Sequence, residues 1–349
     1  MPWWSRDCQS PPGPRSRPLI VLGLVVLVVL AVLAEIPLRT STAAAAWLHS
    51  EATDLTGGSV RPPAGEPGAL ALAASKRRKR HKSGTTATLL AAGDIASCSS
   101  SGDEATAKLL GGLAGTVVTL GDNAYESGTA SEFSNCYKPT WGQQKGRTRP
   151  AVGNHEYLTS GAAGYFGYFG AAAGDAKKGY YSYNLGAWHI VALNSNCSKV
   201  GGCGAGSPQE TWLRQDLAAH PTKCTLAYWH HPRFSFGEYG NDTGTKALWQ
   251  ALYEAGAEIV LSGHDHNYQR YAPQDPDGTP DREHGIREFV VGTGGANHTP
   301  LTNPPPNVEA SNDEAFGILQ LTLQPDSYDW VFLPIAGQSF TDAGNGTCH

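Results

Sequence analysis

Five short segments combine glycine or proline with oxygen or imidazole side chains, in a fixed order along the chain. They are Gly93-Asp94, Gly121-Asp122-Asn123-Ala124-Tyr125, Gly153-Asn154-His155-Glu156, His230-His231-Pro232 and Gly263-His264-Asp265-His266. Each segment follows an apolar run that predicts a β-strand. Alone, each is an ordinary turn after a strand. Together they contain enough ligands for two metal ions. A two-metal site is typical of enzymes that cleave phosphate esters.

The donor types narrow the choice of metal. Asp94 and Asp122 are hard oxygen donors, Asn154 offers a carbonyl oxygen, and Tyr125 offers a phenolate to a strongly Lewis-acidic ion. The nitrogen donors are His230, His264 and His266. This mixture suits iron, zinc or manganese better than copper or calcium. Two ions about 3.5–4 Å apart need a shared carboxylate, and Asp122 is the bridge candidate because it lies between other ligands in chain order.

The elements that must position these residues are short strands alternating with helices. Strands are predicted at 86–92, 116–120, 149–152, 180–185, 188–194, 225–229, 257–262, 287–291, 317–323 and 328–333, and helices at 103–110, 208–219 and 246–255. This alternation predicts an α/β fold in which a β-sandwich is flanked by helices. The ligands then cluster at the carboxyl ends of strands, where the loops converge. The glycine before each ligand lets the backbone turn sharply or approach the site closely.

Other residues have weaker signals. His231 and His298 are candidate substrate contacts, and the Gly-rich stretch before His298 is interpreted as a strand-end loop near the site. His189 lies inside a predicted strand and is expected to be a packed or an edge residue. Arg270 has two interpretations, a phosphate contact or a partner of a carboxylate. Substrate choice is expected to depend on the loops 127–146 and 161–178.

The N-terminal part differs in composition from the rest. Arg6, Arg15 and Arg17 precede an unbroken apolar run over 19–34, and a run of alanines over 43–46 follows. Residues 1–46 are therefore interpreted as a signal peptide or an uncleaved membrane anchor. Residues 47–85 are rich in Ala, Gly, Pro and Ser and end in a basic run, which predicts a disordered linker. The protein is expected to be secreted, or held at the outer face of a membrane or cell surface through this N-terminus.

The remaining part, 86–349, is expected to be one catalytic domain, and its charge excludes one class of partner. The first 85 residues hold 11 Lys and Arg and 5 Asp and Glu, which leaves 15 basic and 26 acidic side chains and a net charge of −11. A nucleic-acid-binding domain usually has a basic face. Specific binding of DNA or RNA is therefore not expected, and the partner is a small phosphorylated substrate.

Cysteine usage agrees with export. Beyond Cys8 the chain has six cysteines, Cys98, Cys136, Cys197, Cys203, Cys224 and Cys348. An even number in an exported domain predicts disulfide bonds. Cys197 and Cys203 bracket a Gly-rich turn and are expected to pair. Cys98 with Cys136 and Cys224 with Cys348 are one of the ways in which the other four could pair.

The five segments resemble the calcineurin-like metallophosphoesterase superfamily, and within it the purple acid phosphatases. The family pattern Gly-Asp-x-x-Tyr is matched by Gly121-Asp122 with Tyr125, Gly-Asn-His-Asp/Glu by the segment at Asn154, and Gly-His-x-His by the segment at His264. The His-x-Pro segment is matched at His230. The resemblance covers residues 86–300.

The resemblance implies a role for each of these residues. Asp94, Asp122, Tyr125 and His266 would hold the first metal, which is typically ferric iron in the purple group, and Asp122, Asn154, His230 and His264 would hold a second, divalent metal (Fe, Zn or Mn). His155 would contact phosphate and assist the leaving group. Hydroxide generated by the metals would attack the phosphorus in line. The first segment departs from the family pattern, because Ala96 stands where relatives carry glycine or a histidine ligand.

These observations predict an exported two-metal enzyme that hydrolyses phosphate monoesters. Two alternatives stay open. One is the same metal centre acting on diesters, such as cyclic nucleotides or phospholipid head groups. The other is a non-catalytic surface module with a degenerate site, against which the complete ligand set argues.

Overall fold

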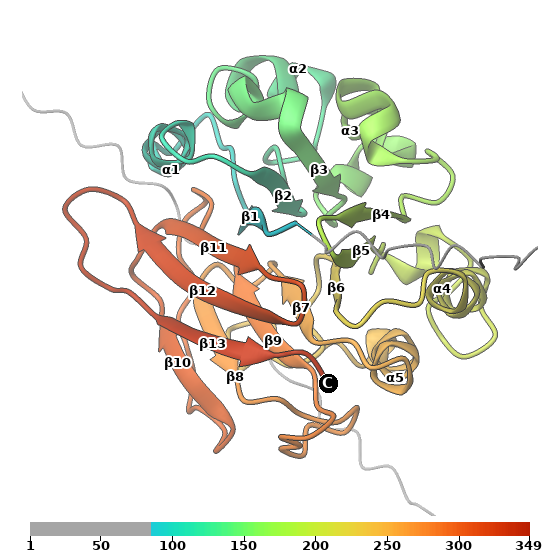
Figure 1. Ribbon diagram of the computed structural model, residues 1–349. Coiled ribbons are helices and arrows are strands. Elements are labelled where there is room, and N and C mark those ends of the chain that lie inside the picture. Colours follow the sequence, from blue (N-terminus) through green and yellow to red (C-terminus); the bar gives the residue numbers. More distant parts are fainter. Residues whose placement is uncertain (1–84) are drawn as a thin grey trace, which may run out of the picture. The chain divides into compact units, whose positions relative to one another are not determined.

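A computed structural model describes residues 85–349 of the chain as two β-sheets with helices around them (Figure 1). The leader predicted over 1–46 and the linker predicted over 47–85 lie outside the described residues, apart from Thr85. Among the helices of this part of the chain, none has the length and apolar character needed to span a bilayer.

The first sheet has six strands in the order β13-β12-β11-β1-β2-β3. They are β1 (Ala87–Ala92), β2 (Thr116–Leu120), β3 (Thr148–Ala151), β11 (Gly317–Leu323), β12 (Ser327–Pro334) and β13 (Ala343–Thr347). β1, β2 and β3 run parallel, whereas β11, β12 and β13 join by antiparallel pairing.

The second sheet has seven strands in the order β10-β8-β9-β7-β6-β5-β4. They are β4 (Tyr181–Leu185), β5 (Trp188–Ala192), β6 (Thr225–Tyr228), β7 (Ile259–Ser262), β8 (Tyr268–Tyr271), β9 (Arg287–Val291) and β10 (Val308–Asn312). The central strands β5, β6, β7 and β9 are parallel, so their carboxyl ends share one edge. The predicted hairpin over 180–194 is confirmed as β4 and β5.

Alternating side chains along the strands build two apolar layers. Ile259 and Leu261 of β7 belong to the core shared by the two sheets, and Val260 between them packs in a second cluster with side chains of α4 (Pro208–Ala219) and α5 (Lys246–Glu254). Both faces of this strand are buried, which is why it reads as a continuous apolar run. The predicted sandwich flanked by helices is confirmed.

The remaining helices and short helical turns lie in the connections between strands of both sheets (Figure 1). They are α1 (Gly102–Gly111), α2 (Ala130–Glu132), α3 (Ala163–Phe169) and the short helical turns η1 (Phe133–Tyr137), η2 (Trp141–Arg147), η3 (Glu156–Leu158), η4 (Ser160–Ala162), η5 (Gly170–Ala173), η6 (Cys197–Lys199) and η7 (Thr243–Thr245). The segments 127–146 and 161–178 were expected to be substrate loops, and most of their length is helical instead. Tyr165 and Phe169 of α3 are buried in the core, so that part of the chain serves packing.

Three disulfide bonds close the fold, Cys98–Cys136, Cys197–Cys203 and Cys224–Cys348. The expected pairing of Cys197 with Cys203 is confirmed, and the other four cysteines pair in the way that was named as one of those open to them. The last bond joins residues 124 apart in the sequence and fastens the end of the chain beyond β13 to the start of β6. Bonds that close long loops restrict the unfolded chain most, so this one is expected to stabilise the domain strongly.

Candidate metal centre

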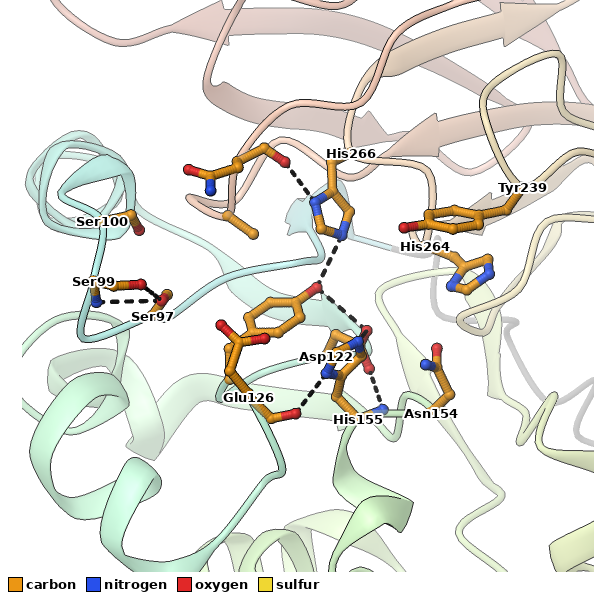
Figure 2. Close-up of a pocket in the computed structure, with 13 residues that line it drawn as sticks. Ser97, Ser99, Ser100, Asp122, Glu126, Asn154, His155, Tyr239, His264 and His266 are labelled. Atoms are coloured by element: carbon orange, nitrogen blue, oxygen red, sulfur yellow. Dashed lines mark hydrogen bonds and ion pairs between the residues drawn. The ribbon is translucent and has the colours of Figure 1, made fainter. Parts of the chain in front are cut away.

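The expected ligands come together at one edge of the sandwich, directly after strand ends. Figure 2 shows Asp122, Asn154, His264 and His266 among them. Asp94 follows β1, Asp122 and Tyr125 follow β2, Asn154 follows β3, His230 follows β6, and His264 and His266 follow β7. Parallel neighbouring strands end at the same edge, so loops from both sheets meet there.

Four of these side chains meet around the phenol oxygen of Tyr125. This oxygen lies 3.0 Å from Oδ1 of Asp94, 3.2 Å from Oδ2 of Asp122 and 3.0 Å from Nε2 of His266. Asp94, Asp122 and Tyr125 are almost completely buried. Oxygen and nitrogen atoms thus lie within hydrogen-bond distance of one another, although few of them carry a hydrogen that could be donated.

A second group meets around Nε2 of His230. This nitrogen lies 2.8 Å from Oδ1 of Asn154, 3.2 Å from Oδ2 of Asp122 and 3.2 Å from Nδ1 of His264. Asp122 therefore belongs to both groups, one of its oxygens facing both Tyr125 and His230. This is the position that a bridging carboxylate requires.

Backbone carbonyls orient the imidazole rings. Nδ1 of His230 donates to the carbonyl oxygen of Leu120 at 2.8 Å, and Nδ1 of His266 donates to that of Asn297 at 2.6 Å. In a neutral ring with its proton on Nδ1, the lone pair of Nε2 points into the site. Lone pairs of nitrogen and oxygen then face one another across the centre, an arrangement that a cation stabilises. The donor set and its orientation fit metal ions.

The backbone around the ligands is strained. Asp94, Asp122 and His264 adopt φ angles of 59°, 45° and 70°, in the left-handed region. Such a conformation costs about 1–3 kcal/mol per residue and is found mostly where function requires it. Asp and His tolerate it better than β-branched residues do.

Two glycines are needed because the backbone comes very close to the ligands. A Cβ at Gly153 would lie 2.0 Å from Oδ1 of Asp122, and a Cβ at Gly263 would lie 2.6 Å from Oδ2 of Asp94. Any side chain there would displace the carboxylates. The expectation that glycine allows close approach is confirmed at these two positions.

The electrostatics of the site follow from burial and charge. Burial alone would lower the pKa of His230, but the carboxylates of Asp122 and Asp94 outweigh it and raise the pKa to about 9. Burial would raise the pKa of Asp122, whereas the charge and hydrogen bond of His230 hold it below its usual value. Burial and repulsion by His230 lower the pKa of His264 to about 2, which keeps that ring neutral. The negative charge of Asp122 therefore stabilises positive charge next to it, whether on His230 or on a bound cation.

Glu156 links two of the loops that carry ligands. Its Oε1 accepts from the backbone N–H of Asn123 at 2.7 Å, and its Oε2 accepts from that of Gly153 at 2.7 Å. The side chain is completely buried. Glu156 thereby holds the loop of Asp122 against the loop of Asn154, a positioning role that the sequence pattern did not reveal.

A cavity of about 310 Å³ opens onto the ligands. It is lined by Ser97, Ser99, Ser100, Asp122, Tyr125, Glu126, Asn154, His155, Tyr239, His264, His266, Ala296 and Asn297. Nδ1 of His155 donates to the carbonyl oxygen of Glu126 at 2.6 Å, and its Nε2 lies 3.9 Å from Oδ2 of Asp122. His155 is thus held at the cavity wall beside the shared carboxylate.

His231 and His298 do not line this cavity. Nδ1 of His231 lies 2.7 Å from Oγ of Ser195, behind the ring of His264 at 4.5 Å between centroids. The ring of His298 stacks on Phe316 at 4.0 Å. Their role as substrate contacts stays a prediction, and their positions outside the cavity wall do not support it. Arg270 pairs with the carboxylates of Asp342 and Glu309, so the second of its two interpretations is correct.

Sequence reasoning missed several residues of the cavity wall. Ser97, Ser99 and Ser100 lie between β1 and α1, and Tyr239, 53% exposed, lies between β6 and α5 with its ring 4.6 Å from that of His264. Nothing in their local sequence marks them, because only the fold brings these loops to the site. The Gly-rich loop after β9 does lie at the site, as expected, and contributes Ala296 and Asn297.

Comparison with known proteins decides the family. The profile of the calcineurin-like phosphoesterase family matches residues 87–268. The chain belongs to this family. Members of the family use metal ions. The resemblance to purple acid phosphatases is also confirmed by curated relatives and by solved structures.

Among the curated proteins, purple acid phosphatase 15 of Arabidopsis thaliana is 33% identical over 104 residues, 28% of this chain and 19% of that protein. Probable purple acid phosphatase 20 of the same plant is 26% identical over 163 residues, 44% of this chain and 37% of that protein. The matched region thus spans well under half of the length of either relative.

Solved structures share the fold at low sequence identity. A purple acid phosphatase from yellow lupin (Lupinus luteus) seeds is similar with a TM-score of 0.62 and 18% identity, over 76% of this chain and 54% of that one. GAP50, the anchor in the inner membrane complex of Plasmodium, is similar with a TM-score of 0.60 and 13% identity, over 76% and 89%.

Proposed function

We propose that this protein is an exported, binuclear metal-dependent phosphoesterase that hydrolyses phosphate monoesters. The observation that carries the proposal is the meeting of seven donor side chains in two groups that share one carboxylate, Asp122, with two imidazoles oriented by backbone carbonyls. A non-catalytic module would not need buried, strained and mutually repelling donors.

The two groups of contacts support a division of the ligands between two metal ions. Asp94, Asp122, Tyr125 and His266 would hold one, and Asp122, Asn154, His230 and His264 the other. The phenol in the first group favours a strongly Lewis-acidic ion such as ferric iron, and the second group suits divalent iron, zinc or manganese. Bound there, the ions would supply charge stabilisation for the phosphoryl group in the transition state.

His155 is the group of the chain that would handle a proton. Its Nδ1 is committed to the carbonyl of Glu126, so its Nε2 is the atom available to the cavity. Protonated on both nitrogens, the ring can donate from Nε2 to a phosphoryl oxygen or to the leaving oxygen. His155 would thus orient the ester and release the alcohol.

Export is supported by the three disulfide bonds, since such bonds persist in oxidising compartments. The domain of net charge −11 gives no basis for nucleic acid as a partner. Association with a membrane or cell surface through the N-terminus stays a proposal.

Diester hydrolysis is the second candidate, and one feature favours it. A neighbouring groove of about 330 Å³ shares Ser97, Ser99, Tyr125 and Glu126 with the metal cavity. A second substituent on the phosphorus would have room in that groove. The two candidates therefore differ in what fills the space beside the phosphate.

A pair of chromogenic substrates separates the candidates. The full chain, loaded with iron, zinc or manganese, is given 4-nitrophenyl phosphate and bis(4-nitrophenyl) phosphate side by side. The proposal expects at least about tenfold higher kcat/KM on the monoester, equivalent to ~1.4 kcal/mol. A preference for the diester would replace it with a phosphodiesterase, and no turnover of either ester would overturn both candidates.

A further inference from the structure

The wall between the metal cavity and the neighbouring groove contains a carboxylate that the chemistry above does not use. Glu126 lines both spaces, together with Ser97, Ser99 and Tyr125. In Figure 2, Glu126 and the three serines lie on the side of the cavity opposite to Tyr239 and His264. A leaving group that extends from the phosphate toward the groove would pass this wall.

The backbone of Glu126 is held from both directions. Its N–H donates to Oε1 of Glu132 at 2.7 Å, and its carbonyl accepts from Nδ1 of His155 at 2.6 Å. The residue itself is exposed, and within residues 85–349 no ion pair to its carboxylate is found. A carboxylate fixed at its base and left without a cation is arranged to meet a positive or hydrogen-bond-donating group from outside the chain.

The serines beside Glu126 belong to a restrained loop. Oγ of Ser97 and Oγ of Ser99 lie 2.7 Å apart, and Oγ of Ser100 donates to the carbonyl of Gly295 at 3.1 Å. The disulfide Cys98–Cys136 ties this loop to η1, and both cysteines line the groove. The wall is therefore a preformed polar surface with Glu126 as the carboxylate that is free to meet a substrate, since the carboxylate of Glu132 in the groove is already bonded to backbone N–H groups and to Thr129.

From this arrangement we infer that Glu126 selects the leaving group by charge: the site prefers phosphate monoesters of alcohols that carry an amine, accepts those that carry a hydroxyl, and rejects those that carry a second anion. The inference rests on the proposed function and adds the substrate class. The ammonium group would pair with Glu126, and the serines would bond to its remaining protons. A second carboxylate or phosphate would meet Glu126 with like charge in a domain that is already acidic.

Three esters of matched size test this selection. They are O-phosphoethanolamine, 2-hydroxyethyl phosphate and phosphoglycolate, in which a two-carbon leaving group carries an ammonium, a hydroxyl or a carboxylate. The metal-loaded full chain should give kcat/KM in that order, with the first and last differing by at least about tenfold at low salt. The difference should shrink at ~1 M salt, because ions screen an exposed charge.

Glu126→Gln should compress the ratio between the first and last ester by about fivefold to tenfold, because it removes the charge and keeps the shape. Glu126→Lys should reverse the order. Glu283→Gln is the matched control: Glu283 is an exposed carboxylate that lines neither the cavity nor the groove, and its removal should leave the ratio within about twofold of the unsubstituted chain.

Two results would overturn the inference, a ratio that Glu126→Gln leaves within twofold of the original, and an unsubstituted chain that prefers phosphoglycolate. If none of the three esters is hydrolysed, the proposed function fails by itself. The affinities of the metal-loaded chain for the same three esters, measured by calorimetry, then decide on the inference, with the same order and the same effect of Glu126→Gln expected.

Discussion

Within residues 85–349, aspartate and histidine form one cluster around Asp122 and another around Asp216, and the clusters differ in where their ring nitrogens point. Around Asp122 the rings of His230 and His266 are held from behind by carbonyls, and Nε2 of each faces other acceptors. Around Asp216, Nε2 of His189 bonds directly to the carboxylate at 2.8 Å, and Nδ1 faces Oδ1 of Asn184 at 2.9 Å.

The geometry of the second cluster does not suit an ion. Nδ1 of His220 bonds to the carbonyl of Asp216, and its ring stacks on that of His189 at 4.7 Å with 16° between the planes. A metal ion lies close to the plane of an imidazole that binds it, and two stacked, nearly parallel rings share no such point. His189 is therefore a packed residue, one of the two possibilities that the sequence left open, and it ties β5 to the end of α4.

The comparison shows that residue types alone do not make a metal site. Both clusters contain a buried aspartate and neighbouring histidines. What distinguishes them is that Nε2 of His230 faces several donor atoms at once, whereas each ring nitrogen of His189 meets one hydrogen-bond partner and its ring stacks on that of His220.

The largest expected difference between the clusters is catalytic. Asp122→Asn should lower kcat/KM on a phosphate monoester by at least about a thousandfold, because the carboxylate proposed to bridge the two metal ions loses its charge. Asp216→Asn should leave kcat/KM within about twofold, since Asp216 lies outside the cavity wall. Steady-state kinetics of the two variants check this, and circular dichroism verifies that each is folded. Equal losses in both variants would remove the distinction.

Removal of metal should have the next largest effect, and on stability as well as activity. Buried donors that face one another repel without a cation, so a chelator should lower the melting temperature by at least about 5 °C and abolish hydrolysis, and added metal should restore both. Differential scanning calorimetry with parallel assays measures this. A chelated, inactive sample that melts at the original temperature would show that the donors are not coupled to folding.

The smallest effect is expected in the cluster around Asp216. His189→Gln should lower the melting temperature by about 2–8 °C, because a buried hydrogen bond to a carboxylate contributes about 1–3 kcal/mol. Hydrolysis and its response to the chelator should stay as in the unsubstituted chain. Loss of activity in His189→Gln at a temperature at which the variant is folded would show that the cluster around Asp216 does contribute to hydrolysis.

Strands β2 and β7, which carry ligands, were predictable because each is an apolar run that ends in glycine and a ligand. β2 ends at Leu120 before Gly121-Asp122, and β7 ends at Ser262 before Gly263-His264. Both faces of these strands are buried, so local composition and tertiary environment agree. Strand β13 was not predicted, because Ala343–Thr347 has little strand propensity and owes its conformation to pairing with β12.

The cavity wall was predictable only in part, for the same reason. Residues in the family patterns, such as Asn154 and His155, carry a local signal. Glu126 and Tyr239 carry none, because their place at the site depends on how loops from separate strands converge. Sequence patterns therefore identified the chemistry, whereas the surface that would choose the substrate needed the structure.

The proposed binding of two metal ions around Asp122 is tested most directly by the metal content of the purified full chain and of two variants, measured by elemental analysis after dialysis. We expect about two metal ions per chain, a loss of at least one in His230→Ala, and no change in His189→Ala. Two ions per chain in all three proteins would mean that the metals bind outside the cluster around Asp122. A metal-free chain that still hydrolyses phosphate esters would contradict the proposed metal centre.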